Sequence, residues 1–169
     1  THDSLTGLPN RVSLQRDLEQ AIDGGEKGAI LQLDLDNFKL VNDKHGHRAG
    51  DRLLISVGSV LRDLIMERDA TVYRLGGDEF AILMEDGDTL ADIKSYVKRL
   101  QEVIAKPFEL LGKDVYVSAS FGIVSCESSY TRASDMLRDA DLAMYRAKKE
   151  GKTGFEVFEE SRHRREFDQ

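Results

Sequence analysis

Apolar residues recur along the chain with two periods, and each period predicts one class of element. Where they lie three or four positions apart they predict amphipathic helices, at residues 11–23, 53–65, 90–104 and 136–147. Where they run together or alternate with polar residues they predict strands, at residues 29–36, 71–75, 80–84, 115–123 and 155–158. Strands separated by helices predict a mixed α/β sheet that is covered by helices.

The first helix, the first strand and the polar stretch that follows this strand each carry a distinctive signal. Asn10 is suited to cap the first helix, and Gly24 with the following glycine ends it. Strand 29–36 is apolar almost throughout, which is typical of a central strand with both faces buried. The polar stretch 36–51 is expected to hold a short helix around residues 38–42.

The composition is that of an ordinary globular domain. The chain has 169 residues, 40% hydrophobic and 33% charged, and we expect one domain, residues 1–158, followed by a charged tail, residues 159–169. The net charge of −7 argues against tight binding to long nucleic acid, but a nucleotide remains possible because a bound metal ion offsets clustered carboxylates. The single cysteine, Cys126, excludes an intrachain disulfide, and we expect it to be a small packing residue.

The sequence also predicts a compartment. No apolar run approaches the ~20 residues that span a bilayer, and no signal peptide is visible. We therefore expect this domain to be cytoplasmic. Because the chain does not begin with methionine, we expect a piece of a longer protein, whose other parts could be anchored in a membrane.

Two aspartates stand at the end of the strand at 29–36. Ligand sites in α/β sheets lie beyond the carboxyl ends of strands, and alternation places Asp34 and Asp36 on one face if the strand continues. An aspartate inside an apolar strand is costly unless it is paired or binds a metal ion. The alternative, that one of them caps the following helix, stays open for Asp36 in particular.

The short connection between the strands at 71–75 and 80–84 has hairpin length. It consists of two glycines and two acids, Gly76, Gly77, Asp78 and Glu79. Glycines allow the backbone to approach a ligand closely, and Mg²⁺ usually takes one or two protein carboxylates, with water and substrate phosphates completing its shell. The alternative is an ordinary solvated turn, which the spacing alone favours.

Acids at two separate strand ends could meet across the sheet, and that arrangement is typical of metal-assisted phosphoryl or nucleotidyl transfer. Lys148, Lys149 and Lys152 surround the end of the last helix. They could hold phosphates or merely complement the helix dipole, and physical reasoning alone favours the dipole. The residues by themselves thus predict an α/β domain that handles metal and phosphate.

The chain resembles a known family over nearly its whole length. Residues 76–80 read Gly-Gly-Asp-Glu-Phe, the motif after which the GGDEF family is named. The other segments that resemble the family occur in its order, at residues 3–11, 33–39, 41–43, 46–51, 120–123 and 140–152. The resemblance implies a diguanylate cyclase, which joins two GTP molecules into cyclic di-GMP and releases pyrophosphate. It also implies an α/β (α+β) fold like the palm of nucleotide cyclases and polymerases, with a central mixed, largely antiparallel five-stranded sheet flanked by helices.

By position, the resemblance assigns catalytic and metal-binding roles. Asp34 and Asp78 would bind the metal ion, Mg²⁺ or alternatively Mn²⁺, with help from the Leu35 carbonyl. Glu79 would bind a second metal ion or help to deprotonate the ribose 3′-hydroxyl. One GTP's 3′-hydroxyl would then attack the α-phosphate of the other in line.

The resemblance also assigns the substrate contacts. They fall to Asn42, Asp51, Lys39, Gly76, Gly77, Lys148 and Lys152. The amide and the carboxylate would read the guanine edge, the glycines would let the backbone lie against the nucleotide, and the lysines would contact the phosphates. Many relatives have arginine at the position of Lys152, and lysine keeps the charge without the bidentate fork.

The resemblance also bears on the assembly of the domain and on its inhibition by product. Each domain would hold one GTP, so two copies must face each other as a two-fold homodimer. Many relatives carry a product-inhibition site, Arg-x-x-Asp, just upstream of the hairpin. Glu67 and Ala70 occupy the matching positions here, so we predict no product feedback through that site.

Two other functions stay open. The chain could be a non-catalytic GTP-binding regulatory module, or a domain that serves mainly as a dimerisation or partner surface. Its tail from Phe158 resembles the linker that often leads to a downstream EAL phosphodiesterase, although an ordinary charged terminus would look similar. The parent protein could therefore contain an EAL or a sensor domain.

Overall fold

The computed structural model describes residues 1–25, 28–66, 68–85, 89–125, 130–151 and 154–158. The helices are α1 (Arg11–Asp23), α2 (Phe38–His45), α3 (His47–Ile65), α4 (Leu90–Ile104) and α5 (Ala133–Glu150). The strands are β1 (Ala29–Asp36), β2 (Ala70–Gly76), β3 (Glu79–Met84), β4 (Phe108–Leu110), β5 (Lys113–Val115), β6 (Ser118–Ser125) and β7 (Phe155–Val157). Cys126, Lys152 and the tail at 159–169 lie outside the described residues.

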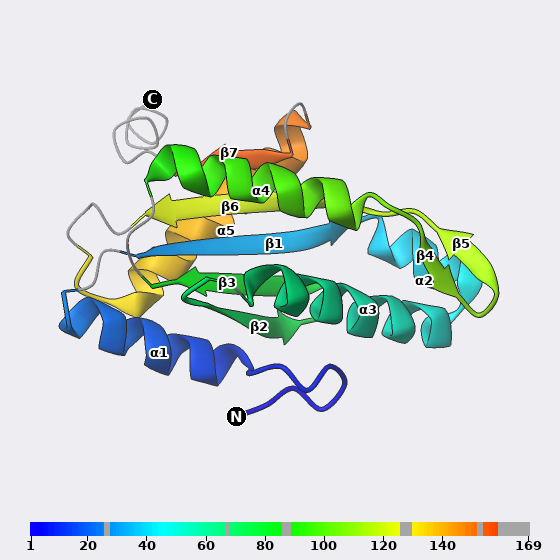
Figure 1. Ribbon diagram of the computed structural model, residues 1–169, viewed down its shortest axis with the longest axis horizontal. Helices are drawn as coiled ribbons and strands as arrows, with labels where there is room; N and C mark the ends of the chain where they lie inside the picture. The colour runs from blue at the N-terminus through cyan, green and yellow to red at the C-terminus, as the bar shows by residue number, and fades with distance from the viewer. Residues whose placement is uncertain (26–27, 67, 86–88, 126–129, 152–153, 159–169) are drawn as a thin grey trace.

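A five-stranded sheet in the order β2-β3-β1-β6-β7 forms the centre of the fold (Figure 1). The strand β1 pairs antiparallel with β3 on one side and with β6 on the other, and only β6 and β7 run parallel. This confirms the predicted mixed, largely antiparallel five-stranded sheet. The predicted central position of β1 is confirmed as well.

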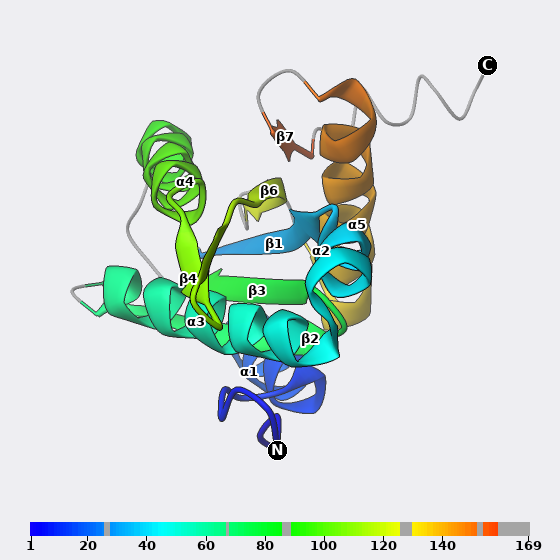
Figure 2. The ribbon, with the colours of Figure 1, turned by 90° about the vertical axis from the view of Figure 1, so that its right-hand side faces the viewer.

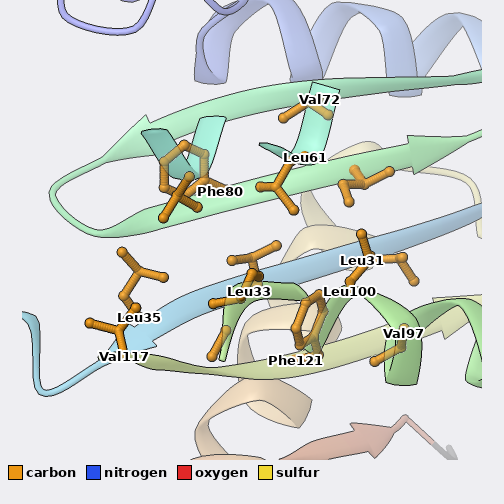
Figure 3. Packing of buried hydrophobic residues seen from close by; sticks show 14 of the residues in the cluster. Leu31, Leu33, Leu35, Leu61, Val72, Phe80, Val97, Leu100, Val117 and Phe121 are labelled. Atoms are coloured by element: carbon orange, nitrogen blue, oxygen red, sulfur yellow. The ribbon is translucent and has the colours of Figure 1, made fainter. Parts of the chain in front are cut away.

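Helices cover both faces of the sheet, with α3 and α4 on one side and α5 on the other (Figure 2). On the first side, Leu31 and Leu33 of β1 lie in the larger core cluster with Leu61 of α3 and Leu100 of α4, and Leu35 lies beside Val117 in the same cluster (Figure 3). Alternation sends the other half of β1 to the opposite face. There Ile30 packs in a second cluster with residues of α1 and α5.

Polar side chains cap the helices α1 and α4 at their first turns. The side chain of Asn10 accepts a hydrogen bond from the Ser13 amide and starts α1, as predicted. Thr89 and Asp92 form a reciprocal capping box at the start of α4. At the start of α5, the side chain of the N-cap residue Arg132 makes no capping hydrogen bond. Instead, Glu19 of α1 accepts a hydrogen bond from the Ala133 amide at 3.0 Å, which ties α1 to α5.

The prediction of one strand over residues 115–123 is wrong. The chain forms β5 up to Val115 and then starts β6 at Ser118. The strand β5 pairs with β4, which the sequence pattern missed, in a separate hairpin away from the main sheet. Val115 and Val117 are both buried, so the alternation of period two continues across the break and hides it.

Within the described part of the chain, no helix is long and apolar enough to cross a membrane.

Candidate functional site

The carboxyl end of β1 meets the tip of the β2–β3 hairpin. Asp34 stands opposite Glu79 in the antiparallel register, and the Leu35 amide donates a hydrogen bond to the Asp78 carbonyl at 3.2 Å. In an antiparallel strand the N–H and C=O of one residue point to the same side, so the Leu35 carbonyl also faces the hairpin. The structure thus brings together the two acidic places that the sequence singled out.

The hairpin turns more tightly than the sequence suggested. Gly76 pairs with Glu79, so the turn itself consists of Gly77 and Asp78 rather than of four residues. Gly76 has φ +131° and Gly77 has φ +49°, which side-chain-bearing residues rarely adopt. These backbone angles explain the two glycines without reference to a ligand.

Arg74 fixes the turn from outside. Its Nη2 donates a hydrogen bond to the Gly77 carbonyl at 2.8 Å, and its Nη1 lies 2.7 Å from Oδ1 of Asp3. The Asp3 carboxylate also accepts hydrogen bonds from the amide and the hydroxyl of Thr6. The segment before α1 therefore supports the hairpin tip, a role that no local pattern in the sequence indicated.

Asp34 is partly buried, and its charge is only partly compensated. Its side chain is 13% exposed, Oδ2 lies 2.8 Å from Nζ of Lys148, and Oδ1 is buried without a hydrogen-bond partner. Burial raises the pKa of Asp34 to about 6, the neighbouring carboxyl of Asp78 adds to the rise, and Lys148 opposes it. The ion pair with Lys148 therefore offsets only part of the cost of an aspartate in this apolar strand.

Glu79 and Lys148 complete the charged cluster. Burial raises the pKa of Glu79, and the charges of Asp34 and Asp141 add to this effect, whereas Arg11, whose Nη2 lies 3.7 Å from Oε2, opposes it. Burial would lower the pKa of Lys148, but the surrounding carboxylates, Asp34 first, outweigh it and raise the pKa. Lys148 therefore stays protonated, and its charge offsets that of the neighbouring carboxylates in addition to complementing the helix dipole.

Asp36 does not cap α2. Its two carboxylate oxygens accept hydrogen bonds from the hydroxyls of Ser118 and Ser120 on β6, both at 2.7 Å. Asn37 is the residue at the cap position, with φ +63° and no side-chain hydrogen bond to the helix. Asp36 does share the sheet face of Asp34, as alternation along the strand predicts.

A second polar group lies where α2 and α3 meet. Asn42 of α2 is partly buried, and its Oδ1 is buried without a hydrogen-bond partner. Asp51 lies exposed in the first turns of α3, directly after the buried Gly50. Lys39 is exposed on α2, and no ion pair is seen for it among the residues that the structure describes.

Comparisons with known proteins decide the family. A family model described as diguanylate cyclase, GGDEF domain, matches residues 1–154. The chain belongs to the GGDEF family. This GGDEF domain is 41% identical over 164 residues to the bifunctional diguanylate cyclase/cyclic di-GMP phosphodiesterase MucR of Pseudomonas aeruginosa, covering 95% of the chain and 24% of MucR. It is 42% identical over 152 residues to the diguanylate cyclase DgcP of Escherichia coli, covering 87% of the chain and 44% of DgcP.

A solved structure matches over almost the whole GGDEF domain. The GGDEF domain of TpbB (YfiN) from Pseudomonas aeruginosa superimposes with a TM-score of 0.84 at 36% identity, covering 94% of this chain and 95% of that one. The resemblance drawn from the motifs and the expected fold are therefore confirmed. Because the chain spans less than half of MucR and of DgcP, the activities of those whole proteins belong to a longer architecture.

The acids of this GGDEF domain suit a divalent cation, which diguanylate cyclases generally need. No three His, Cys, Asp or Glu side chains converge on one point among the described residues. The site instead offers the Asp34–Asp78 pair, the Leu35 carbonyl and a buried carboxylate oxygen without a partner. Mg²⁺ usually takes only one or two protein carboxylates, so this donor set fits it.

Several residues of the site escaped the sequence reading of the GGDEF domain. Arg11 and Asp141 act on Glu79 by charge, and Gln32, buried on β1, donates a hydrogen bond from Nε2 to Asp141 at 2.9 Å. Arg11 lies in the segment 3–11 and Asp141 in the segment 140–152, both of which resemble the family. The motifs therefore contained these residues without indicating their contacts. Lys152 lies outside the described residues, and its phosphate contact stays a prediction.

Proposed function

We propose that this GGDEF domain is an active diguanylate cyclase that condenses two GTP molecules into cyclic di-GMP and releases pyrophosphate. The observation that carries the proposal is the state of Asp34, a partly buried carboxylate with one oxygen paired to Lys148 and the other buried without a hydrogen-bond partner. A buried charge left in this state is costly, and such sites are typical of functional centres. A structural ion pair would have both oxygens satisfied.

The residues have distinct tasks in this mechanism. Asp34, Asp78 and the Leu35 carbonyl would hold the metal ion, which when bound neutralises developing charge on the phosphates. Lys148 carries a positive charge beside these acids and would contact a phosphate oxygen. Glu79 either binds a second metal ion or takes the proton from the 3′-hydroxyl, and its raised pKa suits the second task.

The substrate would lie between the hairpin and α2–α3. The bent backbone at Gly76 and Gly77 leaves room for the nucleotide, and Asn42 with Asp51 supplies donor and acceptor groups for the guanine edge. Lys39 and Lys152 would add charge for the phosphates. One domain offers one such half-site, so the attacking 3′-hydroxyl must come from GTP on a second copy, in a face-to-face homodimer.

A product assay across protein concentration tests the proposal. Wild type with GTP and Mg²⁺ should form cyclic di-GMP at a rate that rises more steeply than protein concentration, because two copies must meet. Glu79→Gln should lower the rate by about 10²-fold or more. Glu102→Gln, an exposed change on α4, is the matched control and should leave the rate unchanged. Retained GTP binding without product at any concentration would refute the cyclase.

A regulatory module is the second candidate. The relative MucR carries both a cyclase and a phosphodiesterase in its name, and the chain covers only 24% of it. A GGDEF domain that binds GTP without turnover could then control an attached EAL phosphodiesterase or another partner. This candidate predicts that adding GTP changes the phosphodiesterase rate of the parent protein and that Asp78→Ala abolishes the change. If the domain is instead only a dimerisation surface, Asp78→Ala has no effect.

A further inference from the structure

Gly50 is a glycine that its backbone does not require. It lies within α3 with ordinary helical geometry, and it is buried. Glycine inside a helix costs about 1 kcal/mol relative to alanine, so its presence at such a position needs another reason. The reason here is a side chain on the neighbouring helix.

The amide of Asn42 occupies the space that a side chain at position 50 would fill. A Cβ on Gly50 would lie 1.8 Å from Oδ1 of Asn42, 2.9 Å from its Cγ and 3.3 Å from Cζ of Phe38. The first two distances are impossible for real atoms, so any residue other than glycine must displace the Asn42 amide. We call this space beside Gly50 the α3 notch.

The other glycine of α3 makes a useful contrast. A Cβ on Gly58, also buried, would lie 3.1 Å from Cδ1 of Leu8, the far end of an apolar side chain, and 3.6 Å from Phe80. That contact requires an adjustment of a few tenths of an ångström. Only the first of the two glycines therefore provides space for a polar group.

The polar group in the α3 notch is held at a cost. Oδ1 of Asn42 is buried there without a hydrogen-bond partner, and an unsatisfied buried acceptor costs about 1–3 kcal/mol. Such exceptions in a folded protein call for an explanation. Asp51, the residue that follows Gly50, is exposed on α3, so the Asn42 amide packs beside the helical turn that carries this carboxylate.

We propose that Gly50 is a positioning residue that sets base specificity: the α3 notch seats the Asn42 amide, and so fixes it for recognition of the purine together with Asp51. This inference rests on the proposed binding of GTP. A methyl group at position 50 would move the amide and leave the acids at the end of β1 untouched. The loss should therefore appear in base recognition and not in the chemical step.

Equilibrium titrations with GTP and with ATP in Mg²⁺ test the inference. Gly50→Ala should weaken GTP binding about tenfold or more, reduce the preference for GTP over ATP, and raise KM while kcat at saturating GTP stays within about threefold. Gly58→Ala, the matched control, should keep both affinity and preference. Adding Gly50→Ala to Asn42→Ala should cause no further loss, because both changes remove one interaction.

Any different result would refute either the role of Gly50 or the proposed binding of GTP. Unchanged GTP binding in Gly50→Ala, an equal loss in Gly58→Ala, or fully additive losses in the double variant refute the role of Gly50. If Gly50→Ala fails to fold, the double variant must fold, since it lacks the displaced amide, and its failure would also refute the notch. Absence of GTP binding by the wild type refutes the proposed function, and the Gly50 assignment with it.

Discussion

Arg74 joins the first residues of the domain to the hairpin, because its guanidinium lies 2.7 Å from the Asp3 carboxylate and donates a second hydrogen bond to the Gly77 carbonyl. Both side chains are largely buried, at 13% and 16% exposure. The position of the turn that carries Asp78 therefore depends on Asp3, which lies 71 positions before Arg74 in the chain.

Asp3→Asn should destabilise the domain by about 1–3 kcal/mol at pH 7. Burial alone would raise the pKa of Asp3, but hydrogen bonds from Thr6 and Arg74 outweigh it and lower the pKa. The stabilisation is thus present above the unfolded value of 3.8 and is lost as the pH falls through the lower folded pKa. Urea unfolding at pH 7 and near pH 3 measures the difference, with the exposed Asp63→Asn as control. A gap that does not shrink in acid would contradict the pairing.

Asp34→Asn should stabilise the metal-free domain at pH 7.5 and destroy its activity. The folded pKa of about 6 lies above the unfolded value of 3.8, so the penalty for the charged form is complete above pH 6 and vanishes as the pH falls below 4. We expect Tm to rise by about 2–6 °C at pH 7.5, with the gain disappearing toward pH 4. Thermal unfolding in a chelator measures it, and an equal gain at both pH values would exclude relief of the buried charge as the cause.

Lys148→Gln should lower cyclic di-GMP formation by about 10–10³-fold and move Mg²⁺ binding to higher pH. The reason is that Lys148 opposes the raised pKa of Asp34, which must lose its proton before it can bind a cation. Lys149→Gln is the matched control, because Lys149 is exposed and its Nζ lies 5.1 Å from the Tyr145 ring centre, not at the acids. Equal losses in both variants would point to general charge rather than to the Asp34 contact.

Cyclic di-GMP should not inhibit this domain through the segment upstream of the hairpin. Ala70, at the start of β2, cannot supply the carboxylate of an Arg-x-x-Asp site, and Glu67, outside the described residues, replaces its arginine. A titration of the isolated domain with cyclic di-GMP provides the measurement. Binding at submicromolar concentration would overturn the prediction.

The sequence predicted those parts of the site that depend on local periodicity. Alternation along β1 was enough to place Asp34 and Asp36 on one face, and the glycines of the hairpin indicated a turn with unusual backbone angles. The other segments that resemble the GGDEF family, together with the hairpin motif, predicted the fold. These features need only neighbours within one element or one hairpin.

The contacts between distant elements could not be predicted in this way. Asp36 receives its hydrogen bonds from serines 82 and 84 residues away, and their identity follows from the register between β1 and β6. The break between β5 and β6 was hidden for a related reason, since buried valines on either side preserved the alternation. The role of Gly50 depends on the packing of α2 against α3, which leaves no trace in a periodicity.

The hydrogen bond from Gln32 to Asp141 spans 109 residues, and it holds the helix that delivers Lys148 to Asp34. Contacts of such long range are slow to form, and during synthesis the amino-terminal part of a chain leaves the ribosome first. The strand with its buried acid is therefore made long before its counterion. A nascent chain that ends before α5 would contain every residue of the hairpin motif and still lack Lys148, the counterion of Asp34. The proposed nucleotide chemistry therefore requires translation of the domain through α5.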